Sequence, residues 1–331
     1  MTVELKTVDI RPLRHTFGTV AEQIGGDKAA SRYQEAMLGA QSKDNFHYRS
    51  TWDSEYEIYD SRRTAIKMRN WYDLKDPRQF YYASWTMARA KQQDAMESNF
   101  QFVESRGLLD AIPENVRQLA LDVLVPLRHV AWGANMNNCT ICDLGYGTAF
   151  SASSMFYALD SLGVAQYLTR IGWSIADPGA LDIAKHSWLT ASVWQDLRRY
   201  VEDTLVVQDP FELFIAQNLV LDGLLYPLIY DEFVDGKIAL QQGGPIAMLT
   251  SFMVDISAET SRWIDATVKV AVAESADNKK QIQEWTDQWS ARAIEALTPI
   301  ASLAFGDQSV LALEEVQESW VARCSKLGLF Q

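Results

Sequence analysis

Histidine and cysteine are scarce in this chain, and their scarcity narrows the chemistry it can perform. Among 331 residues there are four histidines and three cysteines, Cys139, Cys142 and Cys324. Three cysteines are too few for a disulfide framework in a chain of this length, which agrees with a reducing compartment. Cys139 and Cys142 have CxxC spacing, but a structural zinc or an iron–sulfur cluster normally has four ligands. We interpret them as ordinary reduced thiols.

Long apolar runs and an excess of basic residues are also missing. No stretch approaches the roughly 18 to 20 uninterrupted apolar residues that a membrane span requires, and the first twenty residues lack the apolar run of a secretory signal. The net charge of −13 disfavours nonspecific binding of nucleic acid, because a phosphate backbone is met by Lys and Arg. We therefore expect a cytoplasmic protein that binds neither membrane nor nucleic acid.

Motifs for acyl transfer and for nucleotide binding are absent as well. Neither G-x-S-x-G nor G-x-x-x-x-G-K-[ST] occurs in the sequence. The stretch GYGTAF offers Gly145 and Gly147, but Phe150 stands where the dinucleotide fingerprint has its third glycine, and no strand and crossover surround it. These observations argue against a self-contained nucleotide-dependent enzyme.

What the sequence does contain is a series of long helical patterns. Apolar residues recur at helical spacing from Tyr81 to Val103, and a second helix is expected from Glu114, with Pro126 kinking or restarting it. Further helices are expected within residues 154–173, 181–205, 210–233, 245–275 and 279–305. The patterns predict an all-α bundle of long helices, with an arm at 1–76, a helical domain at 77–305 and a C-terminal helix at 306–331.

The arm before residue 77 is polar and irregularly patterned, yet it is rich in aromatic side chains and arginines. Such a segment lacks the means to bury its aromatic residues, including Tyr72, in a core of its own, so we expect it to lay them on another protein surface. The candidate partner-contact residues are Trp52, Tyr56, Tyr59, Arg62, Arg63 and Trp71.

Bundles of long helices can hold a dinuclear metal site, made from a Glu of each of two helices and a Glu-x-x-His of each of two others. At that spacing the chain has Pro12 before His15, Asp44 before His47, Pro126 before His129 and Ile183 before His186. Only the pair in the polar arm has a carboxylate, and there is no second copy. A histidine in an apolar helix, such as His129 or His186, is far more often a hydrogen-bonded core or interface residue.

A metal site made of carboxylates alone remains an alternative at this point. Most helical carboxylates are solvated or paired with a base, so this alternative is the weaker one. Its candidate ligands are Asp94, Glu97, Glu202, Asp203, Glu212, Asp255 and Glu259.

Several segments, taken in order, resemble the β subunits of the hydroxylase component of bacterial multicomponent monooxygenases, most closely those of phenol hydroxylases. They are RPLRHTFGTV, SRYQEA, DPRQFYYASWTMARAKQQDAMES, VPLRHVAWGANMNN, ELFIAQNLVLDGLLYPLIY, TSRWIDATVKVAVAES and IQEWTDQWSARAIEAL. No single segment is a catalytic signature. Together they cover nearly the whole chain.

The resemblance implies a ferritin-like fold that lacks the metal site of the larger α subunit, which carries two Glu-x-x-His motifs and a di-iron centre. It implies no cofactor in this chain, and a dimer of αβγ protomers as its setting. A regulatory protein and an NADH-dependent reductase with flavin and a [2Fe-2S] cluster would serve this complex, which converts phenol to catechol with dioxygen. No ligand residue carries over to this sequence.

Three functions therefore remain open from the sequence. The first is a non-catalytic structural subunit of a phenol monooxygenase. The second is a self-contained metal-dependent helical oxidase with a carboxylate-only site. The third is a helical scaffold unrelated to oxygen chemistry. The first function also predicts that the chain aggregates when it is isolated, because loss of its partner would expose the aromatic residues of the arm.

Overall fold

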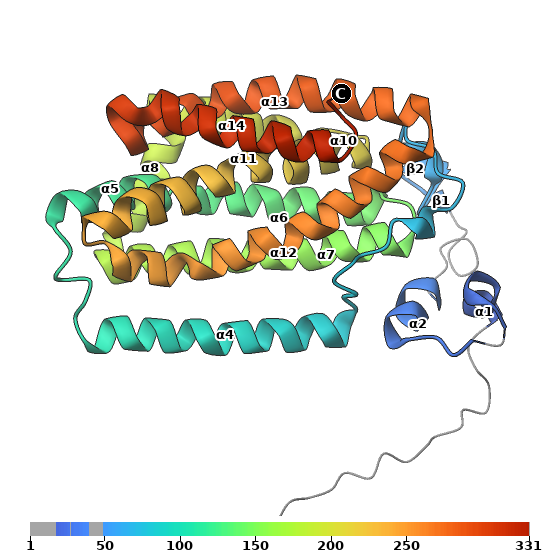
Figure 1. Cartoon of the computed structure of the whole chain (residues 1–331), viewed down its shortest axis with the longest axis horizontal. Coiled ribbons are helices and arrows are strands. Elements are labelled where there is room, and N and C mark those ends of the chain that lie inside the picture. The colour runs from blue at the N-terminus through green and yellow to red at the C-terminus, as the bar shows by residue number, and fades with distance from the viewer. Residues whose placement is uncertain (1–17, 27, 40–48, 331) are drawn as a thin grey trace, which may run out of the picture.

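Long helices lie side by side in layers in the computed structural model, which describes residues 18–26, 28–39 and 49–330 (Figure 1). On one side of the bundle are α13 (Ala276–Phe305) and α14 (Ser309–Lys326), and on the other is α4 (Tyr82–Ser105). Between them run α6 (Leu127–Leu144), α7 (Thr148–Ile175) and α12 (Gly244–Glu274). The prediction of an all-α bundle is confirmed.

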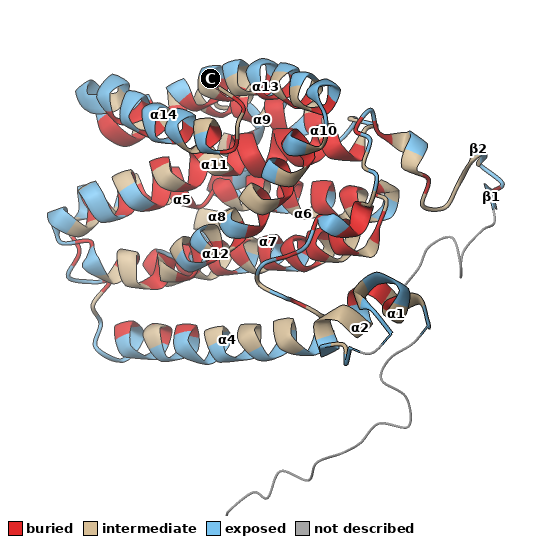
Figure 2. Cartoon of the chain, turned by 45° about the vertical axis from the view of Figure 1, so that its right-hand side comes forward, coloured by how far each residue is buried: buried red, intermediate tan, exposed pale blue. Residues whose placement is uncertain are grey.

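The antiparallel pair α6–α7 forms the centre of the bundle, and burial is concentrated there and in the segment after Pro210 (Figure 2). The helix α5 (Glu114–Leu124) ends just before Pro126, and α6 begins just after it. Proline is suited to a helix start because its missing N–H would be unsatisfied there anyway. Pro126 therefore restarts the helix, which is one of the two outcomes that the sequence allowed.

The connection between α6 and α7 depends on Gly147. Its backbone has φ +87, and a Cβ at this position would lie 3.0 Å from the Cβ of Trp71. Glycine is the residue that adopts this conformation without steric cost. The glycines of GYGTAF thus form a tight turn against the core.

One buried helical run spans Pro210–Gln241 and changes its winding along its length. It contains α10 (Pro210–Phe214), α11 (Asp222–Tyr226), the π-helical stretches η3 (Ile215–Leu221) and η4 (Pro227–Ile238), and the 3-10 turn η5 (Ala239–Gln241). Asp209 caps its start by accepting hydrogen bonds from the N–H groups of Phe211 and Glu212. In π winding, residue i bonds residue i+5, and such winding is rare outside functional or strained positions.

Two helical runs are long and apolar enough to cross a membrane, judged by length and composition alone. These are Pro210–Gln241, whose most apolar window is 89% buried within the protein, and Ala276–Lys326, whose window is 44% buried. A core helix of a soluble protein meets the same criterion. The first run lies almost wholly inside this bundle, and neither run by itself indicates a membrane.

The helix expected within 181–205 is divided in two, α8 (Gly179–Thr190) and α9 (Ser192–Thr204). Ala191 between them has an extended backbone, with ψ 132. The side-chain amide of Gln195 donates to the carbonyls of Trp188 and Ala191, and so satisfies acceptors that the break leaves open. The apolar pattern continues through the break, which is why the sequence did not reveal it.

The N-terminal arm has more structure than its sequence pattern indicated. It contains α1 (Gly18–Ile24), α2 (Arg32–Gly39) and a hairpin of β1 (Arg49–Ser50) with β2 (Asp53–Glu57), all too short to show a period. Its last part is bonded to the bundle of the same chain: the Ala65 N–H donates to Asp209, 2.7 Å, and the Lys67 N–H donates to Asn278, 3.0 Å.

Candidate functional site in the polar interior of the bundle

Two pairs of buried amide side chains face each other between α6 and η3. Asn138 and Asn218 exchange two hydrogen bonds, with N–O distances of 3.0 and 2.9 Å. Next to them, the amide nitrogen of Asn137 donates to the side-chain oxygens of Gln217 and Thr204, both at 2.8 Å. All five side chains are fully buried. The free-energy cost of burying an amide side chain is low only when the amide is hydrogen-bonded in this way.

A carboxyl group, Asp222, continues this network toward α7. It accepts hydrogen bonds from the Gln217 amide, 2.9 Å, and from the Tyr157 hydroxyl, 2.7 Å. Gln217 and Asp222 are five residues apart, and the π winding between them allows them to meet, whereas α-helical neighbours on one face are three or four apart. Burial raises the pKa of Asp222 to about 7, against the lowering effect of these two donors.

This interior network does not fit a dinuclear metal site. The sites built in helical bundles use carboxylates and imidazoles that converge on the metal, whereas this network offers neutral amides, hydroxyls and one carboxyl group. Within residues 18–26, 28–39 and 49–330, no group of three or more His, Cys, Asp or Glu residues is placed to hold a metal ion.

The two histidines that the structure describes lie apart from this network. The ring of His129 stacks on Trp188, with centroids 5.5 Å apart. Burial, and then the nearby charge of Arg128, lowers the pKa of His129 to about 4, so its ring is neutral at pH 7. His186 is exposed on α8. His15, Asp44 and His47 lie outside the described residues.

The candidate carboxylates of the alternative metal site do not converge. Asp94 and Asp255 are exposed. The remaining members are paired elsewhere: Glu97 with Arg170, Glu202 with Arg198, Asp203 with Arg292, Glu212 with the indole N–H of Trp289, and Glu259 with Arg89. They come from different faces of the bundle, so the geometry gives the carboxylate-only site no support.

A second polar network fixes α4 to the rest of the bundle. The guanidinium of Arg89 forms two bonds to the buried carboxylate of Asp160 on α7, 2.6 and 2.7 Å, and two to Glu259 on α12, 2.7 and 3.3 Å. The indole N–H of Trp85 donates to the same Asp160, 3.1 Å. A paired charge is the form in which a buried carboxylate is tolerated.

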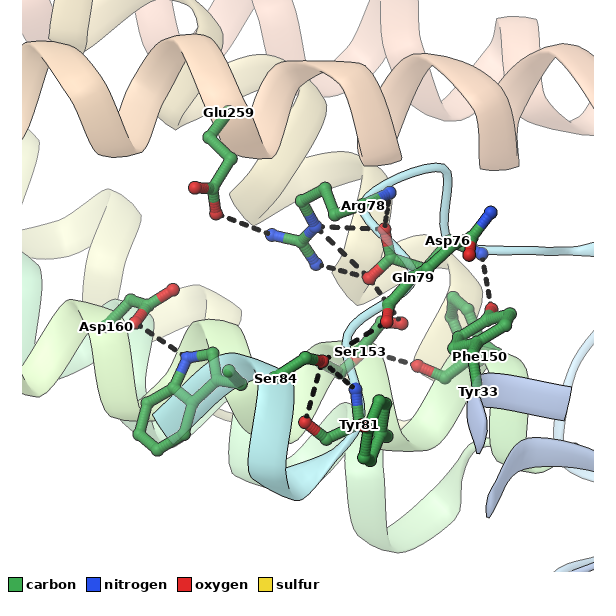
Figure 3. Close-up of polar contacts among 12 residues, drawn as sticks. Tyr33, Asp76, Arg78, Gln79, Tyr81, Ser84, Phe150, Ser153, Asp160 and Glu259 are labelled. Carbon is green, nitrogen blue, oxygen red and sulfur yellow. Dashed lines mark hydrogen bonds and ion pairs between the residues drawn. The ribbon is translucent and has the colours of Figure 1, made fainter. Parts of the chain in front are cut away.

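The same network extends to the chain segment that enters α4 (Figure 3). Arg78 and Asp76 are both buried and bonded through two nitrogens, each at 2.9 Å, and Ser153 of α7 donates to Asp76, 3.1 Å. The Arg78 guanidinium also lies over the ring of Trp263, 5.0 Å from its centroid. These ion pairs connect α4, α7 and α12.

The predicted partner-contact residues of the arm differ in their exposure. Trp52, at 87% exposure, is open to a partner. Tyr56 lies between the guanidiniums of Arg62 and Arg63, and these arginines pair with Asp60 and Asp53. Tyr59 is half-buried.

Trp71, by contrast, presents little surface to a partner, because it is only 7% exposed. Its ring is buried against Tyr146 of the same chain, at a centroid distance of 5.7 Å, and the neighbouring Tyr72 is buried as well. The bundle of this chain supplies the apolar surface that the arm by itself lacks. The sequence could not show this because the contact joins segments far apart in the chain.

The cysteine pair shows no activated thiol. Cys139 and Cys142 are partly buried on α6, and burial raises the pKa of both, that of Cys142 to about 11. A thiolate is the form that binds metals and attacks electrophiles. Both groups are therefore protonated thiols at neutral pH.

The sequence reasoning missed the amide network, although a signal was present. Asn137 and Asn138 interrupt the apolar face of α6, and Gln217, Asn218 and Asp222 interrupt a run that is otherwise almost wholly apolar. Polar residues at buried helical positions on two separate helices indicate that they bond to each other.

This layered bundle of long helices is the fold of the helical hydroxylases. The structure matches that of phenol hydroxylase from Pseudomonas sp. OX1, crystallised under xenon pressure, with a TM-score of 0.92 and 42% identity over 99% of both chains. It also shares its fold with toluene 4-monooxygenase, with a TM-score of 0.76 at 20% identity, over 90% of this chain and 99% of the other. The prediction of a ferritin-like bundle is confirmed.

The chain belongs to the methane/phenol/alkene hydroxylase family, whose model matches residues 52–275. It is 46% identical to the phenol 2-monooxygenase oxygenase component DmpL of Pseudomonas sp. (strain CF600), over 99% of this chain and 98% of that one. It is 39% identical to the corresponding component MhpL of Acinetobacter pittii (strain PHEA-2), with the same coverage.

Proposed function

We propose that this chain is the non-catalytic β subunit of the oxygenase component of a multicomponent phenol monooxygenase. In this role it supports a di-iron α subunit that hydroxylates phenol to catechol with dioxygen and electrons from NADH. The complex would be a cytoplasmic dimer of αβγ protomers served by a reductase and a regulatory protein. The similarity to oxygenase components of phenol 2-monooxygenases over almost the entire chain supports the reaction.

The single observation that carries the non-catalytic role is the amide network in the bundle interior. Asn137, Asn138, Gln217 and Asn218 bond to one another between the helices where bundles of this kind hold metal ligands. Neutral amides are poor ligands beside the carboxylates and imidazoles that iron prefers. The interior is therefore suited to holding helices together, and oxygen chemistry is assigned to a partner.

The support that this subunit gives is mechanical. Metal sites lose function when their supporting shell moves by small distances. A bundle with a dense core and internal ion pairs such as Arg89–Asp160 presents a rigid surface to its partner. Helices of the α subunit packed on that surface would keep their ligands at the spacing that dioxygen activation needs.

Metal analysis of the co-expressed oxygenase tests this proposal. The chain is produced with the proteins of the adjacent reading frames, and iron and manganese are measured in the intact complex and in the separated subunits. We expect iron to follow the subunit with two Glu-x-x-His motifs, and phenol hydroxylation to be lost when this chain is left out. Near-stoichiometric iron or manganese in this chain alone would overturn the non-catalytic assignment.

A further inference from the structure

The central helix α7 has an unusual outer surface. Its exposed residues are Leu159, Leu162, Gln166 and Trp173, and none of them is charged. Over its 28 residues the only charged side chains are Asp160, which is buried, and Arg170, which is half-buried. A helix at the surface of a soluble protein normally shows charged and polar residues outward. Here the exposed face instead carries three large apolar side chains and one amide.

The neighbouring helix α6 continues this surface. Trp132 is 50% exposed and Met136 is 41% exposed. Between Arg128 and Asp143 this helix carries no charged residue, and its one titratable base, His129, is neutral. The Asn135 amide donates to the Ala158 carbonyl, 2.7 Å. This bond shows which residues of the two antiparallel helices lie opposite one another. Met136 and Trp132 therefore lie beside Leu159 and Leu162. We call these four residues, with Trp173, the α6–α7 face.

The exposed surface of α14 does not share this composition. The exposed part of α14 includes Val310 and Leu311, but Glu314, Glu315 and Glu318 stand among them. Single exposed apolar residues of that kind are normal on protein surfaces. Between Leu162 and Trp173 the exposed residue of α7 is Gln166, so the adjacent large apolar side chains of this face are Leu159 and Leu162 with Trp132 and Met136. A cluster of exposed large apolar side chains marks an interaction site.

Charge at the rim of this face indicates its occupant. Arg128 at the start of α6 and Lys185 on α8 both lie near His129, and Asp182 on α8 is near Arg128. Neither base has a carboxylate within ion-pair distance among the described residues. Interfaces have cores depleted in charged residues and rims that are polar and accessible to solvent. A partner with an apolar helical face and an acidic residue at this end fits. A second copy of this chain fits less well, because each copy has a net charge of −13.

We propose that the α6–α7 face is the surface on which this chain binds the di-iron subunit of its oxygenase. This inference rests on the proposed function and locates it on the molecule. The geometry places the contact on the outer side of α7, the same helix whose inner side holds Tyr157 and Asp160. Binding there would join the partner directly to the most buried part of the bundle.

Charge substitutions within the co-expressed oxygenase test the proposal. The double variant Trp132→Glu with Leu162→Glu adds charge at two exposed positions, so the fold of the chain should be retained. We expect this variant to bind the subunit with two Glu-x-x-His motifs more weakly than the wild type does, by a factor of about ten or more. That factor corresponds to a loss of about 1.4 kcal/mol or more in binding free energy. The matched control is Val310→Glu with Leu311→Glu on α14, which should retain the subunit as the wild type does.

The isolated chain provides a second measurement. The wild type should aggregate, and the Trp132→Glu, Leu162→Glu variant should aggregate less because it removes apolar surface. A discrete wild-type homodimer that the same variant dissociates would overturn the assignment in favour of a second copy.

Hydroxyl-radical footprinting of the wild-type complex gives a result that does not depend on any variant. Trp132, Met136 and Trp173 should be protected, while Leu311 should be labelled. Full labelling of these three residues would overturn the proposal even if the oxygenase assembles normally.

If the wild-type chain retains no di-iron subunit at all, it is the proposed function that fails. If both double variants retain it equally, only the location of the contact fails.

Discussion

Asn138 and Asn218 form a closed pair in the bundle interior, in which each amide donates to the oxygen of the other at 3.0 and 2.9 Å. The pair joins α6 to η3 without any charge. Its closure means that the loss of one member leaves the other without its partner. This reciprocity makes the pair a sensitive probe of the interior.

We predict that Asn138→Leu destabilises the chain by about 1 to 3 kcal/mol, because the buried Asn218 amide loses its partner. The double variant Asn138→Leu with Asn218→Leu should recover much of this loss, since two apolar residues leave no unsatisfied group. Thermal unfolding of the assembled oxygenase measures both. Equal and additive losses would show that the two amides are not coupled.

The second prediction concerns pH and Asp222. Because burial raises its pKa from 3.8 to about 7, the folded chain holds a proton on this group that the unfolded chain has released over that range. The contribution of Asp222 to stability is therefore fully present below pH about 4 and is lost as pH rises toward 7, with a slope of up to about 1.4 kcal/mol per unit.

Asp222→Asn should remove this dependence, since an amide does not titrate. The midpoint of thermal unfolding, measured from pH 4.5 to 8, should change less with pH in the variant than in the wild type. Asp255→Asn, at an exposed position of α12, is the matched control and should keep the wild-type profile. Parallel profiles for the wild type and Asp222→Asn would contradict the assignment.

The third prediction compares two arginines that join α4 and α7, Arg89 on α4 and Arg170 on α7. Arg89→Leu leaves the buried carboxylate of Asp160 unpaired, and losses of about 3 to 5 kcal/mol are typical of that change. Arg170→Leu breaks a pair with Glu97 in which both partners are substantially exposed, and such pairs contribute about 0 to 1 kcal/mol. Hydrogen exchange of α4 should therefore rise strongly in the first variant and little in the second. Similar exchange in both would show that α4 is held by other contacts.

The fourth prediction concerns two glycines of one helix pair. Gly147→Ala should destabilise the chain by about 1 to 2 kcal/mol, because a side chain is strained at φ +87 and its Cβ would lie 3.0 Å from Trp71. Gly163→Ala, inside α7, would meet Phe252 at an ordinary 3.7 Å and should stabilise by about 0.5 to 1 kcal/mol. The two unfolding midpoints should thus move in opposite directions.

The sequence by itself determined the helical class and most of the long helices, because the period of apolar residues reports which face of a helix is buried. It also determined that histidine and carboxylate cannot recur at the spacing of a dinuclear site, since this is a matter of order along the chain. The sequence did not predict the break at Ala191 or the short elements of the arm, because a single turn or a two-residue strand has no period to detect.

Only the tertiary structure decided which side chains meet. Trp71 has the same exposed-looking surroundings in the sequence as Trp52, yet one is buried against Tyr146 and the other is open. The amide network joins residues 80 positions apart, and the π winding that brings Gln217 to Asp222 depends on how that run is packed. Contacts of this kind are set by the folded arrangement of helices, which the local period of a sequence does not encode.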